Sequence, residues 1–144
     1  MMRDKLGLFG EDKNDRQLID DLLNWMEKYK IDYTNTFCHL MEIKINGNTY
    51  KDEAFITWFD EWKKRSKLNN SSKEKQIELM KKNNPIVIPR NHKVEEALEA
   101  ANNNNLEPMN NLLSILKKPY MKQSNIENFQ APSNNKNYQT FCGT

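Results

Sequence analysis

The cysteines and histidines are the side chains in this sequence that could act as nucleophiles, bases or metal ligands. Cys38 and His39 are adjacent, whereas His92 and Cys142 stand far from them and from each other. Zinc takes about four ligands, which structural sites usually draw from closely spaced Cys and His pairs. These four residues lack that spacing, so we predict no metal site and interpret Cys38 as a small buried hydrophobe.

Phosphoryl and nucleotidyl transfer need other groups: a backbone cradle for phosphates, a cation, and carboxylate or amide ligands for magnesium. The four glycines are scattered singly, and the sequence has no G-x-x-x-x-G-K-[ST] loop and no H-R-D or D-F-G pattern. Asp20 and Asp21 are adjacent on an expected helix, where neighbours point about 100° apart and cannot converge on one atom. We therefore predict that this chain contains no catalytic or cofactor-binding residue and does not bind ATP by itself.

The segment 84–90 interrupts the helical pattern of the sequence. Pro85 and Pro89 fix their own φ angles and push the preceding residues towards extended backbone, so no helix passes through this segment. Neither proline can donate to a sheet ladder, which argues against a central strand. We expect an extended crossover whose apolar residues 86–88 lie against helices.

Polar residues flank this crossover and should fix its path. Asn84 precedes Pro85, and Asn91 is placed to cap the next helix through its side-chain oxygen. Arg90 lies beside the same helix N-terminus, where a cation opposes the helix dipole, so it is expected to have an acidic or carbonyl partner. We predict that Asn84, Pro85, Arg90 and Asn91 form a structural or interface motif.

Several short motifs, in a fixed order, carry a resemblance to a known family. They are Lys5-Leu6-Gly7-Leu8, Ile19-Asp20-Asp21-Leu22-Leu23, Asp32-Tyr33-Thr34-Asn35-Thr36-Phe37, Asn84-Pro85-x-x-Ile88-x-Arg90-Asn91-His92, Val94-Glu95-Glu96-Ala97-Leu98, Leu112-Leu113-x-x-Leu116-Lys117-Lys118-Pro119-Tyr120 and Thr140-Phe141-Cys142-Gly143-Thr144. Together they span essentially the whole chain. The sequence resembles the C-terminal region of the selenoprotein O family.

The resemblance implies a function for a longer protein. Members of that family have a protein-kinase-like fold and transfer AMP from ATP to Ser, Thr or Tyr hydroxyls of proteins. Their ATP-binding and catalytic residues lie in lobes N-terminal to this region, so ATP and magnesium are expected only for the full-length protein. The expected partners are that N-terminal kinase-like catalytic region and, in the full-length context, protein substrates. An autonomous helical protein-interaction module without catalytic activity is the alternative.

The resemblance also implies a redox role for Cys142. The family carries a cysteine or selenocysteine near its C-terminus, linked to redox control through pairing with a cysteine of the catalytic domain, and Cys142 stands in the matching position. The nearby terminal carboxylate disfavours the thiolate, so reactivity requires a cationic neighbour or a docked partner. An inert terminal thiol is the alternative.

Apolar periodicity predicts an all-α fold of about six to seven short helices in an irregular bundle. The clearest stripe is Phe55, Trp58, Phe59 and Trp62, spaced i, i+3, i+4, i+7. Burial of each side chain should contribute at least ~1.5–3 kcal/mol, so this helix is expected to anchor the core. Weaker stripes follow other segments: Leu18, Ile19, Leu22, Leu23, Met26 and Tyr29; Phe37, Leu40 and Met41; Ile77 and Met80; Val94, Ala97, Leu98 and Ala101; Met109, Leu112, Leu113 and Leu116.

Helix ends are predicted from capping residues and from glycine. We expect N-caps at Asn14 or Asp15, within 33–36, and in a capping box formed by Ser71 and Glu74. Residues 43–50 allow either a helix that ends at Gly47 or a hairpin around it. The helix end is favoured because a lone hairpin is marginally stable.

Two regions are expected along the chain. Residues 1–118 should form the helical C-terminal region of a larger kinase-like protein, and residues 119–144 an extended tail ending in a cysteine. Residues 122–137 have few apolar groups and are expected to be poorly ordered unless they dock on another surface.

Composition narrows the class of partner. The 22 basic and 20 acidic residues give a net charge of +2. This charge is much smaller than the positive charge typical of nucleic-acid-binding domains. The sequence contains no run of about 18 apolar residues and no signal-peptide pattern. Two cysteines do not form a disulfide framework. We expect a bacterial, cytoplasmic protein without nucleic-acid or membrane partners.

Overall fold

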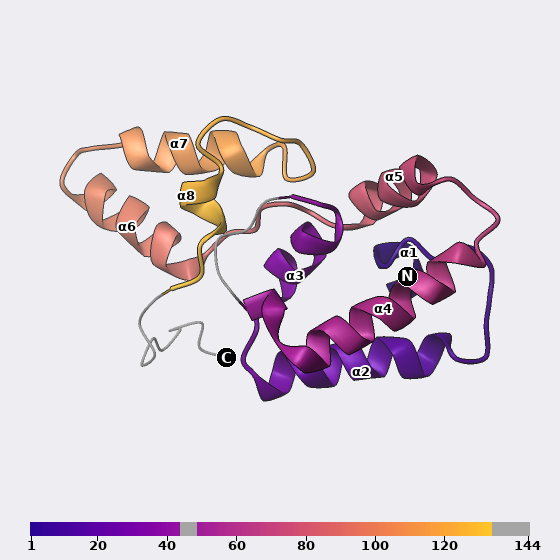
Figure 1. Ribbon diagram of the computed structural model, residues 1–144. Helices are drawn as coiled ribbons and strands as arrows, with labels where there is room; N and C mark the ends of the chain where they lie inside the picture. Colours follow the sequence, from indigo (N-terminus) through magenta and orange to yellow (C-terminus); the bar gives the residue numbers. More distant parts are fainter. Residues whose placement is uncertain (44–48, 134–144) are drawn as a thin grey trace. The chain divides into compact units, whose positions relative to one another are not determined.

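The computed structural model describes residues 1–43 and 49–133, and these residues form helices joined by loops (Figure 1). The elements are α1 (Met2–Lys5), α2 (Asp15–Lys28), α3 (Tyr33–Leu40), the 3-10 helix η1 (Thr49–Lys51), α4 (Glu53–Lys67), α5 (Lys73–Asn83), α6 (Asn91–Asn102), α7 (Glu107–Leu116) and α8 (Glu127–Gln130). No strand occurs in the described ranges, which confirms the all-α prediction. The number of helices exceeds the expected six to seven because α1 and α8 have four residues each, too few to produce an apolar stripe.

The chain divides into two compact units, Met1–Asn84 (unit 1) and Pro85–Thr144 (unit 2). This boundary falls within the predicted crossover. The expected division at residues 118 and 119 concerned the organisation of a longer protein and stays a prediction. Gly47 and residues 134–144, which include Cys142, lie outside the described residues.

Unit 1 is built around α4, which runs beside α2 (Figure 1). Of the four residues of the predicted aromatic stripe, Phe55, Trp58 and Trp62 are buried and Phe59 is half-buried. Two indoles also tie α4 to other segments: Trp58 Nε1 donates to the Leu18 carbonyl oxygen at 2.7 Å, and Trp62 Nε1 donates to the Leu6 carbonyl oxygen at 2.9 Å. The prediction that this helix anchors a core is confirmed.

Three helices of unit 1 have an N-cap side chain that accepts a backbone hydrogen bond. The side chains of Asp32, Asp52 and Ser72 accept from backbone N–H groups at the starts of α3, α4 and α5, respectively. The predicted capping positions were therefore wrong by one residue at α3 and at α5, where Ser72 replaces Ser71. At α2, Asn14 occupies the N-cap position but makes no side-chain cap hydrogen bond.

Unit 2 contains α6 packed against α7, together with the crossover and α8. Ile86 and Val87 are buried, which confirms the extended apolar segment. The Ile86 N–H donates to the Pro119 carbonyl oxygen at 2.7 Å, and Gln130 Nε2 of α8 donates to the Ile86 carbonyl oxygen at 2.7 Å. Residues just beyond α7 and within α8 thus hold the crossover in place. Ile126, which immediately precedes α8, is also buried.

Two leucines expected in the core of unit 2 are exposed instead. Leu98 is 50% exposed and Leu113 is 47% exposed, whereas Ala97, Leu112 and Ile115 are buried. Where α6 and α7 pack against each other, they bury a narrower stripe than the spacing of their apolar residues allows. The predicted burial of Leu98 and Leu113 was therefore wrong.

Candidate functional site

The four residues of the predicted crossover motif make separate contacts in the two units. Asn84 is buried in unit 1, where its Nδ2 donates to the carbonyl oxygens of Lys5 and Met80 at 2.8 and 2.9 Å. Lys5 Nζ donates in return to the Asn83 carbonyl oxygen at 2.8 Å. Burial lowers the pKa of the Lys5 ammonium group. Asn84 therefore ties the end of α5 to the residues of α1.

The other three residues belong to unit 2. Pro85 begins the unit, and Arg90 Nη2 donates to the Gln130 carbonyl oxygen at 3.0 Å, so Arg90 has a carbonyl partner of the kind expected. Asn91 is not the cap: it is the first residue of α6, and Arg90 occupies the N-cap position without a side-chain cap hydrogen bond. Arg90 retains extended backbone after Pro89, and Asn91 already has helical backbone. The Asn91 side chain therefore lies one residue C-terminal to the position from which it could cap the helix.

A buried ion pair in unit 1 was not predicted from the sequence. Arg65 Nε donates to Asp15 Oδ1 at 2.5 Å, and Arg65 Nη2 donates to Asp15 Oδ2 at 3.1 Å. The same guanidinium donates to the Asn69 side chain at 3.0 Å and to the Phe9 carbonyl oxygen at 3.2 Å. Arg65 and Asp15 are 50 positions apart, and no pattern in a single sequence pairs residues at that separation.

Opposing effects determine the pKa of Asp15. Burial, the largest single effect, raises the pKa, but the hydrogen bond and charge of Arg65, an N–H donated by Asp12 and the charge of Arg3 together lower it below its ordinary value. The carboxylate is therefore held ionised, and its partners account for both oxygens. We interpret the pair as a structural link between α2 and α4.

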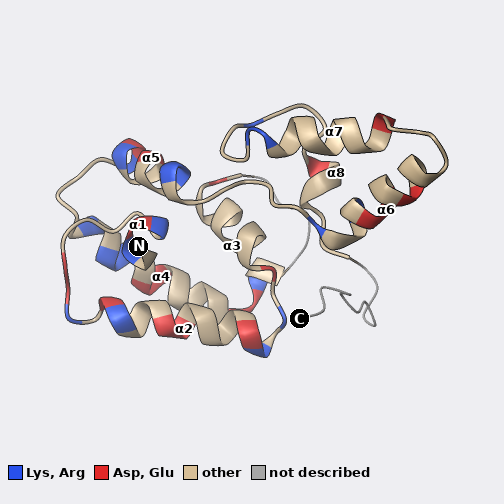
Figure 2. Cartoon of the chain, turned by 180° about the vertical axis from the view of Figure 1, so that it is seen from behind, with Lys and Arg blue, Asp and Glu red and all other residues tan. Residues whose placement is uncertain are grey.

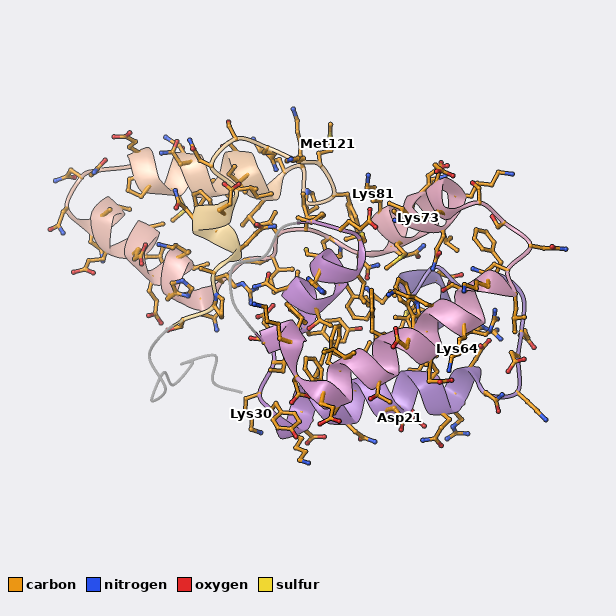
Figure 3. All side chains as sticks on the ribbon, viewed as in Figure 1. Asp21, Lys30, Lys64, Lys73, Lys81 and Met121 are labelled. Atoms are coloured by element: carbon orange, nitrogen blue, oxygen red, sulfur yellow. The ribbon has the colours of Figure 1, made fainter. Side chains whose placement is uncertain are left out.

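A cavity of about 420 Å³ opens on unit 1 between α3, α4 and α5. Its apolar lining comprises Leu40, Phe59, Trp62, Ile77 and Met80, and three lysines, at 63, 67 and 73, also line it. We call this cavity the α3–α4–α5 pocket. Figure 2 shows the basic positions of α5 in blue, and Figure 3 labels Lys73 and, farther along the same helix, Lys81.

The histidines and the described cysteine belong to α3 and α6. Cys38 is buried in α3, which confirms its interpretation as a small hydrophobe. His39 lines the α3–α4–α5 pocket and stacks on Tyr50, with ring centroids 4.0 Å apart, and burial lowers its pKa. His92 belongs to α6 of unit 2. Within residues 1–43 and 49–133, no three His, Cys, Asp or Glu side chains gather in an arrangement that could hold a metal ion.

The longest described helix, α4, has 15 residues, and no helix of the described part is long and apolar enough to cross a bilayer. A transmembrane helix needs about 20 predominantly apolar residues.

Comparisons with known proteins agree with the order of motifs in the sequence. A family model described as "Protein adenylyltransferase SelO" matches residues 1–117. The "Protein nucleotidyltransferase YdiU" of Pelagibacter ubique (strain HTCC1062) is 50% identical to this chain over 147 residues, which cover 100% of the chain and 30% of the relative. The protein of the same name from Bacillus cereus (strain ATCC 14579) is 46% identical, over 99% of the chain and 30% of the relative. The chain thus spans about a third of the length of these relatives, and it belongs to the SelO family of protein adenylyltransferases.

Proposed function

We propose that this chain is the helical C-terminal part of a protein adenylyltransferase. The complete enzyme would transfer AMP from ATP to Ser, Thr or Tyr hydroxyls of proteins, with magnesium, in the cytoplasm. The observation that carries this proposal is the family match: relatives named protein nucleotidyltransferase align with the whole of this chain but extend well beyond it. The role assigned to this part is support of the kinase-like catalytic region.

The structure of unit 1 suits a supporting role. Phosphoryl and nucleotidyl transfer depend mainly on holding nucleotide, metal ions and acceptor in a fixed geometry, so the parts around the reaction must be rigid. The α4 indoles and the Arg65–Asp15 pair fix α4 against α2 and against the segment that follows α1. Such a scaffold can hold a neighbouring catalytic region without contributing reacting groups itself.

A chimera tests the proposal. The segment of the P. ubique relative that matches this chain is replaced by the 144 residues, and transfer of labelled AMP from ATP to protein is measured with magnesium present. We expect the chimera to be active and the 144-residue chain alone to be inactive. The unmodified relative serves as the positive control. Activity of the chain alone, or a folded but inactive chimera, would contradict the proposal.

We propose in addition that Cys142 forms a disulfide with a cysteine of the catalytic region. The two thiols together would lose two electrons and two protons to an oxidant such as oxidised glutathione. We expect the oxidised chimera to migrate differently on a non-reducing gel and dithiothreitol to reverse this change. Cys142→Ser should abolish the response, whereas Cys38→Ser, at a buried position, should retain it. A response that survives Cys142→Ser would refute the assignment.

A further inference from the structure

The α3–α4–α5 pocket has no role in the function proposed above, and its lining indicates what it could accept. Its apolar lining comes from α3, α4 and α5: Phe59 and Ile77 are half-buried, whereas Leu40, Trp62 and Met80 are buried. The volume of about 420 Å³ falls within the ~300–1,000 Å³ range of binding pockets. Concave sites lined mainly by apolar side chains commonly bind ligands or partners.

Two polar side chains that line the pocket, Gln76 and Ser66, already have partners within the protein. Gln76 Nε2 donates to Ser66 Oγ at 2.8 Å, and Ser66 Oγ donates to the Trp62 carbonyl oxygen at 2.8 Å. A ligand would gain little from hydrogen bonding to these groups, because they would have to exchange existing bonds. The interior of the pocket therefore favours an apolar occupant.

The rim of the pocket is basic. Lys63, Lys67 and Lys73 line it together with one acidic residue, Glu42, which forms an ion pair with Lys73. Lys63 also forms an ion pair with Asp60 at 3.7 Å, so the three lysines and these two carboxylates together carry a local charge of +1. Lys63 Nζ also lies over the Phe59 ring, 4.3 Å from its centroid, so cations flank the apolar lining directly. An occupant that carries carboxylates beside its apolar side chains would complement both features.

We propose that the α3–α4–α5 pocket is the docking site for a segment of the catalytic region, in which apolar side chains are flanked by Asp or Glu. This inference rests on the proposed function. The relatives supply the reason to choose this occupant: about 70% of their length, the remainder after the 30% that matches, lies outside this chain. A support must present a surface to the part that it supports, and this pocket offers apolar contact and charge complementarity together.

Co-purification tests this assignment. The part of the P. ubique relative that lies outside the match is co-expressed with the tagged 144-residue chain, and the amount retained on the tag is measured. Ile77→Ser removes an apolar lining residue, and Lys67→Glu reverses a charge of the rim. Each variant has a matched control that does not line the pocket: Ile56→Ser, at an exposed isoleucine of α4, and Lys81→Glu, at an exposed lysine of α5 (Figure 3).

We expect Ile77→Ser to weaken binding at least about tenfold and Lys67→Glu by about three- to tenfold, while both control variants bind like the wild type. The effect of Lys67→Glu should diminish at about 0.5 M salt because screening weakens the charge attraction. Circular dichroism and urea titration of each variant establish that it folds. Because Lys67 is exposed, its substitution tests the pocket even if Ile77→Ser unfolds unit 1.

The outcomes separate this inference from the function on which it rests. If the wild-type chain retains the partner and the pocket variants retain it equally well, the pocket assignment is wrong and the supporting role stands. If the co-expressed part of the relative is soluble and folded by circular dichroism but the wild-type chain does not retain it, the supporting role fails and the inference fails with it. If the chain alone dimerises and the pocket variants dissociate the dimer, the occupant is a second copy, which also overturns the inference.

Discussion

Units 1 and 2 are both helical, but their interiors are of different kinds. Aromatic side chains fill much of the interior of unit 1: Trp25, Phe55, Trp58 and Trp62 are buried, and neighbouring rings contact one another, with Trp25 and Phe55 centroids 4.8 Å apart. The buried hydrophobic residues described for unit 2 are all aliphatic: Ile86, Val87, Ala97, Leu112, Ile115 and Ile126. Large rings bury more apolar area per residue, so unit 1 gains more stability from each helix that it packs.

The polar contacts of the two interiors also differ in the charge of their partners. Unit 1 contains the Arg65–Asp15 pair, in which both partners are charged and buried. In the described part of unit 2, the neutral side-chain amide of Gln130 donates to the Ile86 backbone carbonyl oxygen. The backbone carbonyl oxygen of Gln130 accepts from the Arg90 guanidinium. Hydrogen bonds between charged groups are stronger than neutral ones, and removal of one charged partner costs more.

This contrast indicates how stability is distributed along the chain. A unit with few large buried side chains opens at lower free energy than one with a dense aromatic core. We therefore expect unit 1 to persist as a folded body while residues 85–133 exchange more readily with open states.

The largest effect is expected from the aromatic core of unit 1. Trp62→Ala should lower the free energy of unfolding by about 3–5 kcal/mol, because it removes a buried ring and its hydrogen bond to Leu6. Urea unfolding followed by the fluorescence of Trp25 and Trp58 measures the change. Ile56→Ala, at an exposed position of the same helix, serves as the control. It should change the free energy of unfolding by less than about 0.5 kcal/mol. Equal shifts for the two variants would contradict the assignment of α4 as the core helix.

A somewhat smaller effect is expected from the buried ion pair. Asp15→Asn leaves the Arg65 charge buried without its carboxylate and should cost about 3 kcal/mol near neutral pH. The pKa of Asp15 in the folded protein is lowered, so the stability it contributes is present above the unfolded pKa of the carboxyl group. That contribution is lost as the pH falls through the folded pKa.

The wild type and Asp15→Asn should therefore converge in stability in acid, below the ordinary pKa of an aspartate. Urea midpoints measured between about pH 7 and pH 3 test this sign. Asp20→Asn, at an exposed carboxylate of the same helix, is the matched control and should show no such convergence. A gap between wild type and Asp15→Asn that widens in acid would show that the pair does not stabilise the folded state.

The sequence predicted the buried face of α4 better than that of the weaker stripes, where Tyr29 of unit 1 is 46% exposed, as Leu98 and Leu113 of unit 2 are about half exposed. Phe55, Trp58 and Trp62 are so large that only one face of their helix can be buried, and the spacing identifies that face. In α7, Leu112 and Leu113 are adjacent and equally apolar, and spacing alone does not determine which of them the neighbouring helix covers. The structure buries Leu112 and exposes Leu113.

Long-range pairings were outside the reach of sequence reasoning. The prolines of the crossover predicted its extended path, and the helix dipole predicted the kind of partner that Arg90 needs, but neither identified Gln130. The Arg65–Asp15 pair and the α3–α4–α5 pocket likewise bring together residues from distant segments. Periodicity and capping rules describe neighbours along the chain, whereas these features depend on how helices are packed against one another.

The smallest effect is expected in unit 2, at the contact between α8 and the crossover. Gln130→Ala removes the side-chain hydrogen bond to the Ile86 carbonyl oxygen, which should cost about 1–2 kcal/mol of local stability. The Ile86 N–H, which donates to Pro119, should then lose about tenfold or more of its protection from hydrogen exchange, because ~1.4 kcal/mol corresponds to a factor of ten. Amide hydrogen exchange measured by NMR resolves this position from those in α4.

Asn128→Ala, at an exposed residue of the same short helix, is the control and should leave the protection of Ile86 unchanged. If Gln130→Ala lowers protection in unit 2 and leaves α4 of unit 1 as it was, the two units open separately, and the contrast between their interiors is also a contrast in their stability. If protection falls equally in both units, they unfold as one cooperative body. The stability of unit 2 would then depend on the folding of unit 1.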